Sequence, residues 1–146
     1  METHIVSLAL LLLGTATVFD LRTGKVPNQL IIAGFVIGAI VQIRSPEDGV
    51  RYLAIATATV GILYPLFLIK GLGAGDIKLF SALSLYCTPL FLAEVMVYSL
   101  FAGAGISAGR LLLSRVRKRD METHYIHYTV CILLAYVVKA VQEASV

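Results

Sequence analysis

The sequence has 146 residues, of which 58% are hydrophobic and only 14% are charged, and its formal net charge is +3. Soluble domains contain roughly 45–50% apolar and about 25% charged residues, so this composition excludes an ordinary water-soluble domain. Lipid must cover much of the apolar surface, and we expect one membrane-embedded, all-α domain over residues 1–146. The basic excess is typical of cytoplasmic loops beside a membrane, and no nucleic-acid partner is expected.

The first apolar run covers residues 5–19 and is followed by Asp20. It has the length of a signal-peptide core, but Glu2 is the only full charge before it, so the basic segment of a signal peptide is absent. We therefore expect a retained first helix. Further apolar runs over 30–43 and 52–69 predict the second and third helices.

A longer apolar run covers residues 77–113, which is 37 residues. As a single helix it would be roughly 55 Å long, almost twice the thickness of the hydrocarbon core of a bilayer. Pro89 interrupts the run, so we divide it into helices over 77–87 and 90–113. A last run over about 125–141 brings the total to six transmembrane helices, which we expect to form a compact bundle.

Basic residues are distributed unevenly between the predicted loops. The odd-numbered loops and their flanks hold nine, namely Arg22, Lys25, Lys70, Lys78, Arg110, Arg115, Arg117, Lys118 and Arg119. The remaining loops and the C-terminal tail hold three, namely Arg44, Arg51 and Lys139. By the positive-inside rule, the odd loops of this multi-pass protein face the cytoplasm and both termini face outward, so Asp20 and Asp76 lie at the cytoplasmic side of the cell membrane.

The first acidic motif reads Asp-Leu-Arg-Thr-Gly-Lys-Val-Pro-Asn over residues 20–28. We expect Asp20 to end the first helix, Gly24 and Pro27 to form the turn, and the second helix to begin near residue 29 or 30. Arg22 and Lys25 are explained sufficiently as basic residues that reach from a helix end to lipid headgroups.

The second acidic motif reads Gly-Ala-Gly-Asp over residues 73–76. Gly73 and Gly75 lack Cβ atoms, so backbone or substrate can approach Asp76 closely. Asp76 would be the N-cap or a first-turn residue of the fourth helix, and an acidic cap at a glycine-rich turn is an ordinary structural feature. Lys78 is two residues further along and faces another side of that helix, so we expect it to reach headgroups or another helix rather than Asp76.

Asp20 and Asp76 form the strongest candidate for a catalytic pair. Ionisable side chains at membrane depth are costly, which favours a functional interpretation. Two carboxylates about 3 Å apart share one proton, so the charged member can take a proton from water while the protonated member donates to a peptide carbonyl. The sequence therefore predicts an aspartyl protease pair, without assigning the acid and the base, because such a pair titrates as a unit.

The other polar and small residues favour structural interpretations. Glu94 could be a helix contact, part of a structural ion pair or part of a polar pathway, and we favour a structural role. Cys87 and Cys131 lack the spacing of a zinc site and are interpreted as small buried hydrophobic residues. A small-residue face of the fifth helix, which includes Gly103, Gly105 and Gly109, predicts a packing seam. No metal and no cofactor are expected.

The two motifs together resemble those of the type IV prepilin peptidases, a family of GxGD-type aspartyl proteases. The first motif is matched by Asp20, Arg22, Val26, Pro27 and Asn28, and the second by Gly73, Gly75, Asp76, Ile77 and Lys78. The resemblance covers nearly the whole chain as a peptidase domain alone, although the terminal helices match only in hydropathy.

The resemblance implies that Asp20 and Asp76 remove the short basic leader from type IV prepilins or pilin-like precursors, after a glycine, at the cytoplasmic membrane face. The remaining motif residues would position the pair. Larger members carry an N-terminal region with paired Cys-x-x-Cys motifs and also methylate the new N-terminus. This sequence lacks those motifs and resembles the short form associated with Flp-type pili, so no methyltransferase activity is expected.

Two other classes of protein share some of these features. A small transporter or ion-conducting protein also carries acids in its membrane segments and broken helices. Against this alternative, the two acids lie at helix ends on one side, and no inverted repeat is visible in the sequence. A non-catalytic assembly subunit of a pilus or secretion machine would be a degenerate relative, which the intact motif residues oppose.

Overall fold

The computed structural model describes residues 3–42, 46–69, 71–117 and 128–145. Within these residues the chain forms six helices and no strand. The helices are α1 (Thr3–Thr23), α2 (Asn28–Gln42), α3 (Pro46–Leu68), α4 (Ala74–Leu83), α5 (Pro89–Arg117) and α6 (Tyr128–Ala144). The predicted all-α bundle of six helices is confirmed, including the break before α5. Thr88 begins α5 by accepting the Phe91 N–H on its hydroxyl oxygen at 3.4 Å, and Pro89 occupies the first helical position.

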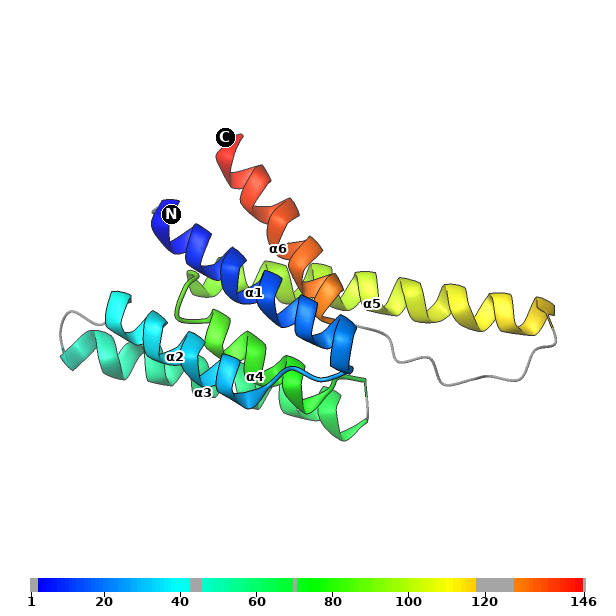
Figure 1. Cartoon of the computed structure of the whole chain (residues 1–146), viewed down its shortest axis with the longest axis horizontal. Coiled ribbons are helices and arrows are strands. Elements are labelled where there is room, and N and C mark those ends of the chain that lie inside the picture. The colour runs from blue at the N-terminus through cyan, green and yellow to red at the C-terminus, as the bar shows by residue number, and fades with distance from the viewer. Residues whose placement is uncertain (1–2, 43–45, 70, 118–127, 146) are drawn as a thin grey trace.

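Successive helices run in alternate directions along the bundle (Figure 1). The last turns of α1 and α3 and the first turns of α2, α4 and α6 therefore lie at one end, and the start of α1 and the end of α6 lie at the other (Figure 1). Because Asp20 belongs to the last turn of α1 and Asp76 to the first turn of α4, both aspartates lie at the same end of the bundle.

Three of the described helices, α1, α3 and α5, contain segments that are long and apolar enough to cross a membrane, and α2 is a shorter apolar helix. Helix α4 has only 10 residues, which corresponds to roughly 15 Å and is about half the thickness of the hydrocarbon core. The predicted bounds of this helix, 77–87, are wrong at both ends. It begins earlier, at Ala74, and it ends at Leu83 because tight turns follow, with the Tyr86 N–H bonded to the Leu83 carbonyl at 2.9 Å.

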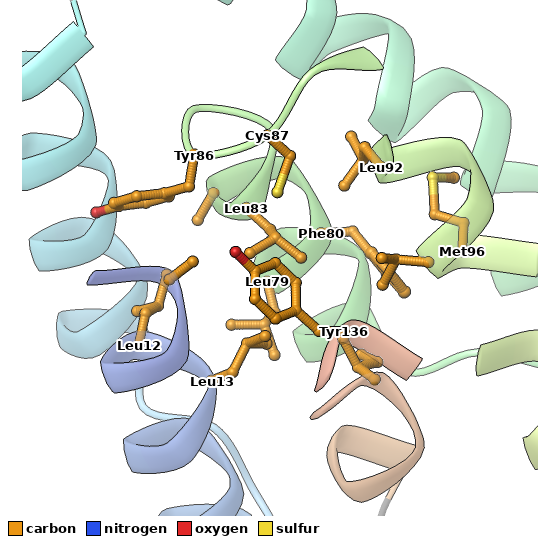
Figure 2. Close-up of a cluster of buried hydrophobic side chains, with 14 of the residues drawn as sticks. Leu12, Leu13, Leu79, Phe80, Leu83, Tyr86, Cys87, Leu92, Met96 and Tyr136 are labelled. Atoms are coloured by element: carbon orange, nitrogen blue, oxygen red, sulfur yellow. The ribbon is translucent and has the colours of Figure 1, made fainter. Parts of the chain in front are cut away.

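Helix α4 lies at the centre of the hydrophobic core. Leu79, Phe80 and Leu83 are completely buried. Figure 2 shows side chains from several helices gathered around these three, namely Leu12 and Leu13 from α1, Leu92 and Met96 from α5 and Tyr136 from α6. Helix α4 packs mainly on α3 and α2, while α6 packs on α5 and α1. The bundle therefore encloses its shortest helix instead of placing it against lipid.

Two glycines spaced four residues apart let α2 approach its neighbours closely. A Cβ atom on Gly38 would lie 2.8 Å from Cβ of Leu85 and 3.1 Å from the Tyr86 ring, and one on Gly34 would meet the Leu12 side chain at 2.8 Å. The Tyr86 hydroxyl also donates to the Gly34 carbonyl. The small-residue spacing is visible in the sequence, but its partners are distant along the chain and only the fold identifies them.

The fold gives Glu94, the two cysteines and the α5 glycines their neighbours. Glu94 on α5 forms an ion pair with Lys139 on α6, which confirms its structural interpretation. Cys87 and Cys131 are buried and free, also as expected. The packing seam on α5 is confirmed only at Gly103, where a Cβ atom would lie 2.6 Å from the Tyr128 ring. At the other two glycines a Cβ atom would meet none of the described residues within 4 Å, so the described part of the bundle does not pack closely there.

Replacing Gly38 with alanine should loosen the bundle. The added methyl group would force α2 away from Leu85, and such overpacking costs typically about 1–3 kcal/mol. Gly61→Ala on α3 is the matched control, because its Cβ atom would meet no atom of the described residues within 4 Å. Unfolding of both variants in one detergent should show a loss for Gly38→Ala and no loss for Gly61→Ala. Equal stabilities would contradict the close packing at Gly38.

Candidate active site

Asp20 lies on the face of α1 that points into the interior of the bundle. Ile5, Ala9, Leu13 and Ala16 precede it at intervals of three or four residues, and all four are buried. Residues at these intervals share one face of a helix. Asp20 continues this face, and its residue is only 8% exposed. Its carboxylate is therefore turned toward the other helices and away from lipid.

Asp20 does not end its helix, contrary to expectation. Helix α1 continues to Thr23, and Gly24 follows with a φ of 68°. The Gly24 N–H donates to the Asp20 carbonyl at 2.8 Å, which is the bond of a glycine cap just beyond a helix C-terminus. Gly24 terminates α1 because glycine adopts this left-handed conformation without a steric penalty. Asp20 therefore sits in the last turn, where regular helix geometry holds its side chain.

Helix α6 contributes a hydrogen bond to Asp20. The Thr129 hydroxyl donates to Asp20 Oδ2 at 2.7 Å, and Thr129 is 1% exposed. Thr129 was not among the residues singled out from the sequence. Its only signal there is a hydroxyl residue at the start of an apolar helix, and nothing local shows which carboxylate it meets. The contact joins residues that are 109 positions apart.

Asp76 occupies the third position of α4, and Gly73 is the N-cap residue, so the first-turn alternative is confirmed. The Gly73 N–H donates to Asp76 Oδ2 at 3.2 Å. The carboxylate thereby covers the free N–H end of the helix, which also favours negative charge. A Cβ atom on Gly73 would lie 3.0 Å from Asp76 Oδ2, so this close approach suits glycine, whereas a Cβ atom on Gly75 would have ordinary room.

The two acidic motifs touch each other at this end of the bundle. Lys78 Nζ donates to Asn28 Oδ1 at 3.2 Å, which joins α4 to the first residue of α2 and confirms that Lys78 reaches another helix. A Cβ atom on Gly75 would lie 3.9 Å from Cβ of Val26. Pro27 immediately precedes α2, and its carbonyl accepts the N–H groups of residues 30 and 31. Arg22, in the last turn of α1, is exposed.

The two carboxylates also interact electrostatically. Asp76 lies outside the three long apolar segments, and its pKa is raised from 3.8 to about 6. Removal of the carboxylate from water is the largest cause, the Gly73 N–H opposes it, and the negative charge of Asp20 adds to the rise. A carboxylate with a pKa near neutrality can exchange a proton under mild conditions, as acid–base catalysis requires.

Two hollows of the molecule lie away from the aspartates. A cavity of about 400 Å³ at the opposite end is lined by residues that include Asp48, Arg51 and Cys87. An apolar groove of about 540 Å³ runs along α1 past Gly14 and Val18, which helical spacing places on the face opposite Asp20. Neither hollow is lined by a residue of the acidic pair. Among the described residues, no group of three or more His, Cys, Asp or Glu side chains could hold a metal ion.

Comparison with known proteins identifies relatives. The sequence model of the type IV leader peptidase family matches residues 7–108. The prepilin leader peptidase/N-methyltransferase of Bacillus subtilis (strain 168) is 29% identical over 120 residues, which are 80% of this chain and 47% of that protein. The chain thus spans about half the length of this relative. No solved structure matches it.

The raised pKa of Asp76 predicts a pH-dependent stability. The folded protein binds this proton more tightly than the unfolded chain, whose pKa is near 3.8, so the contribution of Asp76 to stability is fully present below about pH 4 and is lost as the pH rises through about 6. Asp76→Asn should abolish this loss, and Asp48→Asn is the control that should retain it. Melting curves in detergent across this pH range provide the measurement. An identical pH dependence in Asp76→Asn and wild type would contradict the raised pKa.

Proposed function

The chain belongs to the type IV leader peptidase family, and we propose that it is an aspartic-type endopeptidase that removes the short basic leader from type IV prepilin or pilin-like precursors. One observation carries the proposal. Segments 20–28 and 73–78 meet at one end of the bundle, and the charge of Asp20 acts on Asp76. The named relative combines prepilin leader peptidase and N-methyltransferase in one protein, and only the peptidase activity is proposed here.

In the proposed reaction Asp20 and Asp76 share one proton. The charged carboxylate takes a proton from water as the water oxygen attacks the carbonyl carbon of the glycine that ends the leader, and the protonated carboxyl group donates its proton to that carbonyl oxygen. The resulting tetrahedral diol then collapses. The carbon–nitrogen bond breaks, the amine nitrogen takes a proton from one carboxyl group, and the other carboxylate takes a proton from a diol hydroxyl, which restores the pair.

The remaining motif residues would hold this arrangement. The hydrogen bond from Lys78 to Asn28 joins the two segments directly. Gly73 lacks a side chain, so its N–H can approach the Asp76 carboxylate closely. Gly75 also lacks a side chain, which leaves space between the turn before Asp76 and Val26. Pro27 immediately precedes α2, at the point where the segments meet. Arg22 is exposed and would contact lipid headgroups or substrate.

The proposed substrate has a basic leader followed by an apolar helix. Acidic groups at the site would attract the leader, while basic loops would hold the enzyme against anionic lipid. The apolar helix would enter laterally from the bilayer, and the site would face the cytoplasm with both termini outside. The aspartates lie in a last and a first helical turn. This placement supports cleavage near the interface, which avoids exposing unwound backbone at mid-bilayer.

Removing either carboxylate should abolish leader removal. Asp20→Asn and Asp76→Asn should each lower the cleavage rate by about 10²–10⁴-fold while the protein stays folded and inserted, because each group supplies one of the two proton transfers. The test is co-expression with a Flp-type prepilin, scored by gel shift and N-terminal sequencing.

Asp48→Asn is the matched control for this assay, because Asp48 lines the cavity at the other end of the bundle and should be dispensable. Normal processing by a folded Asp20→Asn or Asp76→Asn protein would refute the acidic pair. Ion flux in liposomes, without cleavage of any of a panel of prepilins, would instead favour the transporter alternative.

Cleavage should also decline at neutral and alkaline pH. The pKa of Asp76 is about 6, so the shared proton is lost as the pH rises past this value, and the rate should then fall about tenfold per pH unit. Initial rates with purified enzyme and prepilin in detergent, from about pH 5 to about pH 8, measure this limb. A rate that stays constant over this range would contradict a mechanism that requires the proton.

A further inference from the structure

We propose that the first turn of α6 forms part of the active site, where Thr129 is a positioning residue that fixes the orientation of the Asp20 carboxylate. This inference rests on the proposed function, because it adds a supporting residue to the same acidic pair. Helix α6 begins at Tyr128, beyond the residues 7–108 that match the family, and it contains no residue of either acidic motif.

The first turn of α6 reaches both aspartates. The Thr129 hydroxyl donates to Asp20 Oδ2 at 2.7 Å. Asp76 lies close enough to Tyr128 and Cys131 for its charge to act on both of these residues. Helix α6 therefore lines the site together with α1 and α4, which carry the two carboxylates.

Contacts with two neighbouring helices hold this turn of α6 in place. The Thr129 carbonyl oxygen lies 3.5 Å from Thr17 Oγ1 on α1, the helix that also carries Asp20. The Tyr128 hydroxyl lies 3.1 Å from Ser99 Oγ on α5, and the Tyr128 ring packs over a glycine of the same helix. The Thr129 hydroxyl is thus oriented before any substrate binds, as a residue that positions another must be.

The bond from Thr129 determines how the Asp20 carboxylate is oriented. The terminal torsion of an aspartate is broad, so a regular helix backbone alone does not fix the plane of its carboxylate. Holding Oδ2 at 2.7 Å from Thr129 Oγ1 fixes that plane and therefore the position of Oδ1. A hydroxyl can donate to a carboxylate and can accept from a carboxyl group, so Thr129 can hold Asp20 in either protonation state.

Thr129 acts on the reaction only through Asp20. Its residue is 1% exposed, so it is not accessible to a substrate. A displacement of about 1 Å in a catalytic group can lower the rate about 10²-fold. Loss of the hydroxyl should therefore lower kcat and leave the KM for the prepilin unchanged.

Thr129→Val is the direct test, because valine keeps the shape and removes the hydroxyl. We expect kcat per folded enzyme to fall about 10–100-fold with an unchanged KM. Thr129→Ser keeps the hydroxyl and should retain a kcat near that of wild type. Thr59→Val is the matched control, because Thr59 is buried on α3 and bonds only to the Ile55 carbonyl of its own helix among the bonds described.

An unchanged kcat in folded Thr129→Val would overturn the proposal, and so would a raised KM in its place. If that variant does not accumulate, Thr129→Ala is compared with Thr129→Ser, since both lack the methyl group of threonine and they differ in the hydroxyl. Equal kcat values for these two variants would again count against Thr129. A purely structural role would lower the stability of Thr129→Val without lowering kcat per folded enzyme.

A double-mutant cycle needs no substrate and separates this proposal from the proposed function. Melting temperatures in detergent are measured for Asp20→Ala, for Thr129→Val and for the double variant. Residues in contact give shifts that do not add, so the double variant should lose less than the sum of the two single losses. The same cycle with Thr59→Val in place of Thr129→Val should be additive.

Additive shifts for Asp20→Ala and Thr129→Val would overturn the proposal whether or not any prepilin is cleaved. Non-additive shifts in a wild-type protein that cleaves no prepilin would count against the proposed function only.

Discussion

The enclosure of α4 is the constraint on which the rest of the structure depends. A helix of 10 residues leaves free N–H groups in its first turn and free C=O groups in its last turn, and the protein itself satisfies several of them. At its C-terminus, tight turns bond to the Phe80, Ala82 and Leu83 carbonyls. At its N-terminus, Asp76 bonds to the Gly73 N–H. The carboxylate that closes the helix is thus the one that a catalytic pair would use.

Packing around α4 uses close approach and polar contacts because lipid provides little hydrophobic driving force between helices. Lipid tails are as apolar as leucine, so helices associate through van der Waals packing and interhelical hydrogen bonds. Gly34 and Gly38 allow α2 to reach α1 and the turn after α4, and Gly103 accommodates Tyr128. The ion pair of Glu94 with Lys139 joins α5 to α6. Helix α6 is thereby held where Thr129 can meet Asp20.

The two aspartates acquire different surroundings from the elements that present them. Asp20 lies on the buried face of a long helix and receives a side-chain hydroxyl from α6. Asp76 lies in the first turn of a short helix and receives a backbone N–H. Two identical side chains can take different roles in acid–base chemistry when their environments differ. The structure supplies such a difference through helices that are distant in sequence.

Much of this architecture is determined by the sequence alone. Its apolar composition, the spacing of its apolar runs and Pro89 predict six helices, because hydrophobic length and helix breaking are local properties. The acidic motifs and their glycines also stand out locally. Only the tertiary structure decided that α1 is terminated by Gly24 rather than by Asp20, and that α4 is buried. It also decided the hydrogen bonds from Lys78 to Asn28 and from Thr129 to Asp20. These features depend on which helices become neighbours, and a single segment of sequence carries no information about a partner that lies 50 or 109 residues away.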